Sequence, residues 1–325
     1  MTRKKGWTMK NGVIFPGCGV AYLGNEKDTL LGHSKDLEEL YLKAKQVVDI
    51  DEALFNTNGN GMPQDELQSQ YLTYLYSCAT ADLLKKKNLE TACCAGYSMG
   101  VYAALYHAGS ISFEDGLRIL NHQYRLMQKA AGDERFSIGA IIGLAPGAVE
   151  KMIFTQFNTV ELINVNNKLS TVVAGPKVDV SEIPAFAKSE GALKTMLLPV
   201  SLPYHTRFMV EATRQYKCIL NRYLADADHV AKTDPEQIAI KKPKMMIISA
   251  INQKDLTTPE EIVDLLTSNL SMNINWMKTM ESMLALGVSE FVECGPGKSL
   301  SIMSRFIQGD FRVYNFSNLA GLFRG

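Results

Sequence analysis

Residues 96–100 (GYSMG) constrain the fold of this chain more than any other segment. They fit the pattern G-x-S-x-G and lie between two apolar runs, at residues 91–95 and 101–107. A strand, a sharp turn and a helix in this order present the Ser98 hydroxyl at a helix N-terminus, where free N–H groups and the helix dipole stabilise negative charge. Glycine is required because the turn brings backbone segments close together. A chance glycine–serine turn is the alternative, and the flanking strand and helix make it the weaker interpretation.

The composition is that of a globular protein from a reducing compartment. Of 325 residues, 46% are apolar and 21% charged, which excludes disordered, collagen-like and coiled-coil chains; the length suggests two domains, or one with an insertion. Lys and Arg total 34, as do Asp and Glu, so no net charge draws the chain to nucleic acid or to an anionic membrane. No apolar stretch has the length of a secretion signal or a membrane span. The six cysteines form no C-x-x-C pair and the five histidines have no metal-ligand spacing, so we expect a cytoplasmic protein without a bound metal.

The middle of the chain carries an element pattern of its own. Apolar runs predict strands at residues 139–144, 160–164, 171–174 and 193–200, and the intervening patterns predict helices at 146–154 and 180–190. The order βαββαβ is that of a ferredoxin-like unit, a four-stranded sheet with two helices on one face. We therefore expect an α/β chain in which an α/β-hydrolase-like large domain, residues 1–134 and 199–325, carries a ferredoxin-like insert at residues 135–198.

Two helices of the large domain are signalled by their ends. Ser112 is a favourable N-cap for a helix that Gly132 ends. Thr258 and Glu261 form a capping-box pattern that opens a second helix. Short apolar runs also predict buried strands, at residues 13–15, 245–250 and 290–294.

A serine nucleophile needs a base, and His205 is the candidate. It follows Pro199 and Pro203, which favour an extended loop able to present an imidazole. The alternative for any single histidine is a packing or surface role.

In sequence order, these segments resemble the malonyl-CoA:acyl-carrier-protein transacylase family, the acyltransferases of fatty-acid and polyketide synthesis. The similarity covers nearly the full length, and its ordered succession is more specific than any one segment. The matching segments are residues 15–19 (FPGCG), Gln70, residues 96–100, residues 164–166 (NVN), residues 198–205, residues 269–270 ahead of Trp276, and residues 293–298 (ECGPGK).

The resemblance implies a mechanism. Ser98 attacks an acyl thioester with His205 as general base, and the backbone carbonyl of Asn269 orients the histidine. The backbone N–H groups of Cys18 and Met99 hold the oxyanion. The substrates are acyl-CoA and the phosphopantetheine of an acyl carrier protein, and no cofactor stays bound.

The chain departs from the family where malonyl groups are recognised. Gln123 occupies the position of the arginine that pairs with the malonyl carboxylate, and a neutral amide supplies no charge. Arg125 lies two positions after Gln123, which on a helix turns its side chain roughly 200° away from the pocket face. Arg118 is the alternative cation that could reach the carboxylate. Tyr97 replaces a histidine beside the serine. Further positions expected at the acyl pocket are Asn166 and Tyr204, and Cys18 replaces a glutamine.

These departures predict acyl transfer from a CoA or carrier-protein thioester to an acyl carrier protein, through an acyl ester on Ser98, with a non-malonyl acyl group. The first alternative is an acyl hydrolase that clears stalled chains from carrier proteins in trans-acyltransferase polyketide synthesis. The second is a non-catalytic module that docks carrier protein, which would not need both Ser98 and His205.

Overall fold

The computed structural model describes residues 10–56, 65–226 and 238–318. The chain mixes helices and strands throughout. Before the middle segment they are β1 (Lys10–Phe15), α1 (Glu26–Leu31), α2 (Asp36–Val47), α3 (Glu52–Asn56), α4 (Glu66–Lys86), β2 (Thr91–Gly96), α5 (Gly100–His107) and α6 (Phe113–Ala131). The middle segment contains β3 (Phe136–Ile142), α7 (Pro146–Gln156), β4 (Glu161–Asn167), β5 (Ser170–Pro176), α8 (Lys177–Ser189) and β6 (Lys194–Leu198). After it come η1 (Arg207–Met209), α9 (Val210–Asp226), β7 (Met246–Ile247), α10 (Pro259–Ser271), β8 (Ile274–Asn275), α11 (Trp276–Ala285), β9 (Val288–Glu293), α12 (Ser299–Ser304) and β10 (Arg312–Tyr314).

The large domain is built on a parallel sheet of order β10-β9-β1-β2-β7. Its central strand β1 is apolar at Val13, Ile14 and Phe15, all fully buried, as expected of a parallel strand covered on both faces. Phe15 pairs with Gly96 at the end of β2, so the loops after β1 and β2 emerge side by side at the same edge of the sheet. This edge carries the predicted Ser98 turn and the predicted oxyanion loop.

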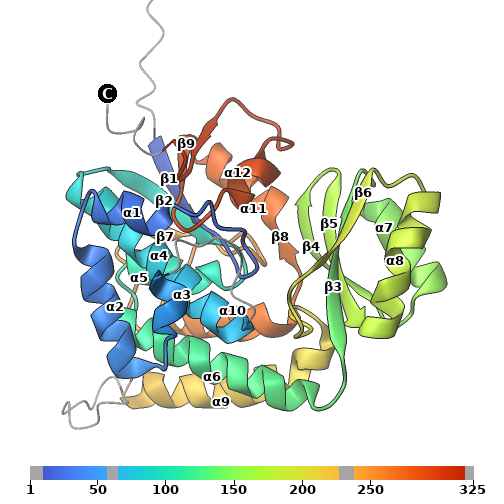
Figure 1. Cartoon of the computed structure of the whole chain (residues 1–325), viewed down its shortest axis with the longest axis horizontal. Coiled ribbons are helices and arrows are strands. Elements are labelled where there is room, and N and C mark those ends of the chain that lie inside the picture. The colour runs from blue at the N-terminus through green and yellow to red at the C-terminus, as the bar shows by residue number, and fades with distance from the viewer. Residues whose placement is uncertain (1–9, 57–64, 227–237, 319–325) are drawn as a thin grey trace, which may run out of the picture.

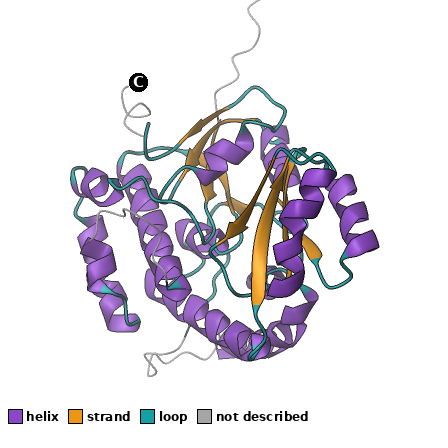
Figure 2. Ribbon diagram, turned by 45° about the vertical axis from the view of Figure 1, so that its right-hand side comes forward, coloured by secondary structure: helices purple, strands orange, loops and turns teal. Residues whose placement is uncertain are grey.

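The middle segment forms an antiparallel sheet of order β6-β3-β5-β4, extended by β8, which pairs in parallel with β4. Helices α7 and α8 cover one face of it (Figures 1 and 2), and a separate apolar cluster lies between these helices and the sheet. The expected βαββαβ order is confirmed, and so is a sheet with both helices on one face. Strand β8 was not expected, because two residues are too few to give a sequence pattern.

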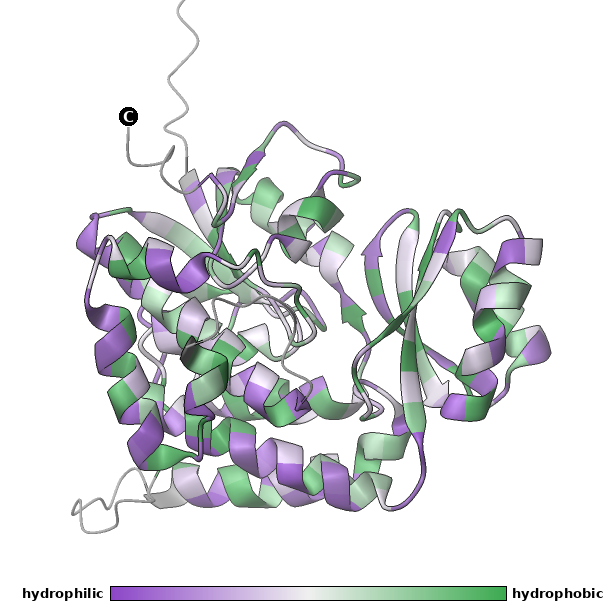
Figure 3. Cartoon of the chain, viewed as in Figure 1, coloured by the Kyte–Doolittle hydropathy of each residue, from purple (hydrophilic) through white to green (hydrophobic). Residues whose placement is uncertain are grey.

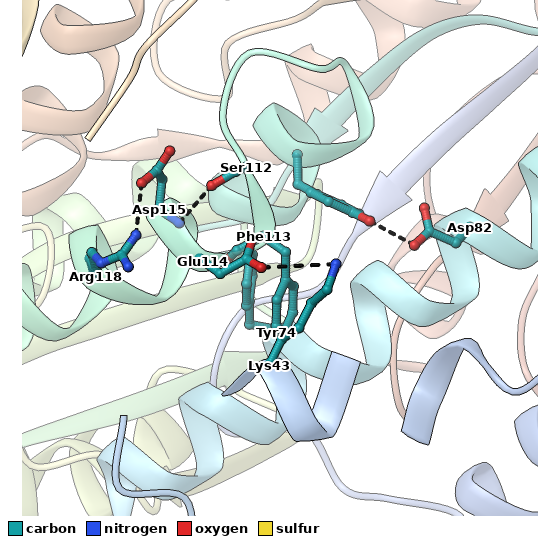
Figure 4. Close-up of polar contacts among 9 residues, drawn as sticks. Lys43, Tyr74, Asp82, Ser112, Phe113, Glu114, Asp115 and Arg118 are labelled. Atoms are coloured by element: carbon teal, nitrogen blue, oxygen red, sulfur yellow. Dashed lines mark hydrogen bonds and ion pairs between the residues drawn. The ribbon is translucent and has the colours of Figure 1, made fainter. Parts of the chain in front are cut away.

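Helix α6 is fixed at its start by several polar contacts (Figure 4). Asp115 N donates to Ser112 Oγ at 3.0 Å, which confirms the predicted N-cap. The Tyr74 hydroxyl donates to Phe113 O at 3.2 Å, and the two rings stack. Gly132 ends the helix with φ 59°. Helices α6 and α9 run together along one edge of the molecule, each mixing hydrophobic and hydrophilic residues (Figure 3).

The other predicted elements agree with the structure except in length. Thr258 and Glu261 form the expected capping box at the start of α10. The strand expected at residues 245–250 is shorter: β7 spans two residues, and Ile248 then bridges back to Asp255. Among the described residues, no helix is both long and apolar enough to cross a membrane.

Candidate active site

The turn between β2 and α5 has the geometry that its sequence requires. A Cβ atom added at Gly96 would lie 2.2 Å from Val101 N, and one added at Gly100 would lie 2.2 Å from Phe15 O. No side chain fits at either position. Between them Ser98 has φ 53°, a left-handed conformation that costs free energy in a residue other than glycine. The turn therefore places Ser98 under strain at the N-terminal end of α5.

The loop ahead of η1 brings His205 to this serine. Ser98 Oγ lies 2.8 Å from His205 Nε2. His205 N donates to Leu270 O at 2.8 Å, and His205 also has a positive φ, 61°. Only 8% of Ser98 and 2% of His205 is exposed, so the hydrogen bond is shielded from solvent.

The surroundings of His205 keep its ring neutral. Burial lowers the pKa of His205 to about 4, and the backbone carbonyls of Met272 and Asn269 oppose that shift in part. Neither carbonyl reaches hydrogen-bond geometry with Nδ1 among the described residues. Ser98 Oγ lies beside Nε2, so base catalysis requires the tautomer that carries its proton on Nδ1 and leaves the Nε2 lone pair free to accept the serine proton.

Asn269 contacts the site with its side chain. Its Nδ2 donates to the backbone oxygen of Ser98 at 3.2 Å, so α10 is joined directly to the turn. The sequence prediction gave this side chain no role. Nothing in the sequence could have identified the contact, because the two residues are 171 positions apart.

The loop after β1 lies against the serine turn. A Cβ added at Gly17 would lie 3.0 Å from Tyr97 O and 3.2 Å from Ser98 Cβ, so glycine lets the loop and the turn pack closely. The backbone N–H groups of Cys18 and Met99, the predicted oxyanion donors, donate to no other described residue. Burial, together with the charge of Glu66, raises the pKa of the Cys18 thiol to about 12, although part of the residue is exposed. A protonated thiol is a poor nucleophile, which disfavours Cys18 in that role.

A cavity of about 470 Å³ lies beside the turn, between the large domain and the antiparallel sheet. Its walls are mostly apolar, with Asn166, Lys194 and Ser299 among the polar contributors. The volume is within the range of small-molecule sites, roughly 300–1,000 Å³. Cys18 and Tyr97 line it from the large domain. Of the four residues expected at the acyl group, Tyr97 and Asn166 line this cavity, whereas Gln123 and Tyr204 do not.

Tyr97 joins the turn to the antiparallel sheet. Its hydroxyl donates to Asn166 Oδ1 at 2.9 Å and accepts from Asn164 Nδ2 at 2.6 Å. Its ring packs edge-on against Trp276, with centroids 5.5 Å apart. The side chain therefore forms part of the junction between the two sheets as well as a wall of the cavity.

Gln123 is buried on α6 and brings no charge. Its Nε2 lies 3.4 Å from Met127 Sδ, and its Oε1 has no hydrogen-bond partner among the described residues. Arg118 pairs with Asp115 at 3.1 Å (Figure 4). Arg125 is exposed and donates to Asn121 on the same helix. Both arginines are thus paired with neighbours on α6 rather than with Gln123.

Comparison with known proteins identifies relatives along almost the whole chain. The malonyl CoA-acyl carrier protein transacylases of Staphylococcus aureus and Haemophilus influenzae are 27% and 28% identical, over 95% and 96% of this chain and 96% of each relative. The crystal structure of FabD from Acinetobacter baumannii superposes with a TM-score of 0.82 at 27% identity, covering 97% of both chains.

The fold and the site define an α/β protein in which a buried serine–histidine pair lies at the edge of a parallel sheet, next to a small antiparallel sheet. A family model described as an acyl transferase domain matches residues 42–300. The chain belongs to this acyl transferase family and is an acyltransferase. The resemblance inferred from the sequence motifs is thereby confirmed.

Proposed function

We propose that this protein transfers an acyl group from a CoA or carrier-protein thioester to an acyl carrier protein, through an ester on Ser98. The 2.8 Å contact between Ser98 Oγ and His205 Nε2 is the observation that carries the proposal. Family membership supports acyl transfer, and the names of the relatives support CoA and acyl carrier protein as the two partners.

Each step uses groups that already lie together. Ser98 Oγ attacks the thioester carbonyl carbon while His205 Nε2 takes its proton. The oxygen that becomes negative faces the N–H groups of Cys18 and Met99. The carbon–sulfur bond then breaks, and His205 returns the proton to the leaving thiolate. A second thiol, the phosphopantetheine of the carrier protein, attacks the ester by the same steps in reverse.

The acyl group is one without a free carboxylate. Gln123 offers a neutral amide where a malonyl enzyme has its arginine, and the nearby arginines Arg118 and Arg125 are engaged elsewhere. A carboxylate moved from water to the side of Gln123 loses hydration and gains no charged partner from Arg118 or Arg125. The mostly apolar cavity beside Tyr97 suits a neutral chain.

The test is a mass measurement on the intact protein after incubation with a panel of acyl-CoA thioesters. A mass increase that is absent in Ser98→Ala identifies the acyl group and its site. Adding carrier protein should then discharge the enzyme and acylate the carrier. An acyl ester that decays equally fast without carrier protein indicates a hydrolase instead. No adduct with any thioester favours the docking-module alternative.

A further inference from the structure

The loop that carries His205 is held from two sides. On one side, His205 N donates to Leu270 O at 2.8 Å, just beyond Asn269 on α10. On the other side the loop contacts the first turn of α4, through Glu66. The loop must hold His205 at a positive φ, which this residue would not adopt without support from its surroundings.

Glu66 accepts three hydrogen bonds from described residues, and all three come from this loop. Its Oε2 accepts from Ser201 N at 2.9 Å and from Ser201 Oγ at 2.8 Å. Its Oε1 accepts from the hydroxyl of Tyr204, the residue before His205, at 2.5 Å. Among the described residues, no lysine or arginine forms an ion pair with Glu66. Both oxygens of the Glu66 carboxylate are therefore hydrogen-bonded to this loop.

A second residue of α4 completes the contact. Gln70, one helical turn after Glu66, donates from Nε2 to the Tyr204 hydroxyl at 2.6 Å. The hydroxyl therefore accepts from Gln70 and donates to Glu66, so its single proton has one partner. Both Tyr204 and Gln70 are buried, and an unmatched polar group at this depth would be costly.

We infer that Glu66 is a positioning residue for the general base: through Ser201 and Tyr204 it fixes the loop that holds His205 Nε2 against Ser98. Glu66 touches neither Ser98 nor His205 directly, so it acts only through the loop. The inference rests on the proposed function only in taking Ser98 and His205 as the reacting pair. It adds a residue that the sequence motifs did not single out. Burial, and after it the charge of Glu66, raises the pKa values of Tyr204 and Cys18, which agrees with a carboxylate close to the site.

Glu66→Gln is the sharpest substitution because it keeps the shape of the side chain and removes one acceptor oxygen. The single oxygen of the glutamine amide can accept a hydrogen bond from Ser201 or from Tyr204, but it cannot replace both oxygens of the Glu66 carboxylate. A small displacement of His205 is enough to slow the reaction, because an error of about 1 Å in a reacting group can cost about 100-fold in rate. We expect Glu66→Gln to react with Ser98-directed reagents about 10- to 100-fold more slowly.

The reagent is a small alkyl fluorophosphonate, which reports on the serine–histidine pair whatever the natural acyl group. Ser98 Oγ attacks phosphorus, fluoride leaves, and His205 takes the serine proton. Intact-protein mass spectrometry gives the maximal rate of phosphonylation and the half-saturating reagent concentration. Positioning predicts that the maximal rate falls in Glu66→Gln while half-saturation changes by less than about threefold.

Asp65→Asn is the matched control. Asp65 precedes Glu66 and its side chain caps α4 by accepting from Gln68 N at 2.9 Å, but it does not contact the loop. The substitution changes the charge by the same amount and keeps an N-cap residue. It should react at the unmodified rate. Tyr204→Phe should resemble Glu66→Gln, and the two effects should not add because they break one hydrogen-bond chain.

A second comparison separates positioning from general damage. In a His205→Ala background the base is gone, so Glu66→Gln should lower the residual rate by less than about twofold. The inference is overturned if Glu66→Gln reacts like the unmodified protein, if only half-saturation changes, or if the loss persists without His205. Fast phosphonylation without any acyl-CoA adduct would contradict the proposed function. The effect of Glu66→Gln on the phosphonylation rate could still be measured, because the fluorophosphonate needs no acyl-CoA.

Discussion

Ser98 and His205 hold left-handed backbone conformations, with φ of 53° and 61°, and face each other across a 2.8 Å hydrogen bond. Strain is therefore placed on both members of the reactive pair. Such conformations cost on the order of 1–3 kcal/mol each and persist only where neighbouring contacts enforce them. Gly96 and Gly100 enforce the first by close packing, and the loop contacts of Ser201 and Tyr204 enforce the second.

Substitution of Ser98 should separate chemistry from stability. Ser98→Ala removes the nucleophile, so no acyl-enzyme should form in a mass measurement, while the fold remains. Ser98→Gly should be equally inactive and at least as resistant to urea as Ser98→Ala, because glycine adopts a positive φ without steric cost. An adduct that persists in Ser98→Ala, or that maps to Cys18, would contradict the assignment.

His205→Ala tests the base. We expect the acylation rate constant to fall by several orders of magnitude, as when the base of other serine enzymes is removed. Substrate binding should be retained, since the ring contacts Ser98 rather than the cavity walls. A stopped-flow or quenched-flow record of acyl-enzyme formation measures this directly, and a loss of less than about tenfold would remove His205 from the proposed mechanism.

The sequence predicted those parts of the structure that depend on local rules. The glycine spacing around Ser98, the Ser112 cap and the βαββαβ order each follow from conformational preferences or periodicity within a short stretch. The contacts that complete the site do not. Asn164 reaches Tyr97 across 67 positions, and Tyr204 reaches Glu66 across 138. A single sequence contains no signal for such pairs. A buried hydroxyl needs a hydrogen-bond partner, but the residue type alone does not identify that partner among distant polar residues.

Tyr97→Phe should weaken the junction between the two sheets. The substitution keeps the ring against Trp276 but leaves Asn164 Nδ2 and Asn166 Oδ1 without the tyrosine hydroxyl. Leaving buried polar groups unmatched costs about 1–3 kcal/mol each, so the free energy of unfolding should fall by a few kcal/mol at most. Urea denaturation measures the change. Tyr314→Phe, which loses one long contact of 3.4 Å to Glu290, is the control and should change stability by less than about 0.5 kcal/mol. Equal stability of the two variants would show that the Tyr97 hydroxyl contributes nothing.

The acylation rate should depend on pH in an unusual way for a histidine base. His205 must be neutral to accept the serine proton, and burial lowers its pKa to about 4. The rate constant for acyl-enzyme formation should therefore stay level from pH 8 down to about 5.5 and fall only as the pH passes through about 4. A free histidine would already be mostly protonated at pH 5.5. A midpoint near 6.5 would show that solvent reaches the ring.

Stability should decline over a wider and less acidic range than the acylation rate, between pH 6.5 and about 4. The pKa values of His205 and His107 are both lowered to about 4 by burial, from an ordinary value of 6.5. Above pH 6.5 neither the folded nor the unfolded chain binds these protons, so the stability is fully present. As the pH falls from 6.5 towards 4, only the unfolded chain binds them, and each histidine costs about 1.4 kcal/mol per pH unit. His107→Leu should reduce this slope in urea titrations at several pH values; an unchanged slope would exclude His107 as a contributor.

The decisive test of specificity rests on Gln123. With a neutral amide at this position, acetyl- and longer acyl-CoA should acylate Ser98 faster than malonyl-CoA, because the malonyl carboxylate would lose a charge-assisted pair with arginine. Such a pair is worth several kcal/mol against about 1.4 kcal/mol for each tenfold in rate, so kcat/KM for malonyl-CoA should be at least about 100-fold lower. Gln123→Arg should recover part of the malonyl activity and depress the neutral substrate. Lys194→Gln should be tested beside it, because the cationic residue Lys194 lines the cavity. If malonyl-CoA is the best substrate of the unmodified protein and Lys194→Gln abolishes that preference, the lysine supplies the charge and the inference from Gln123 is wrong.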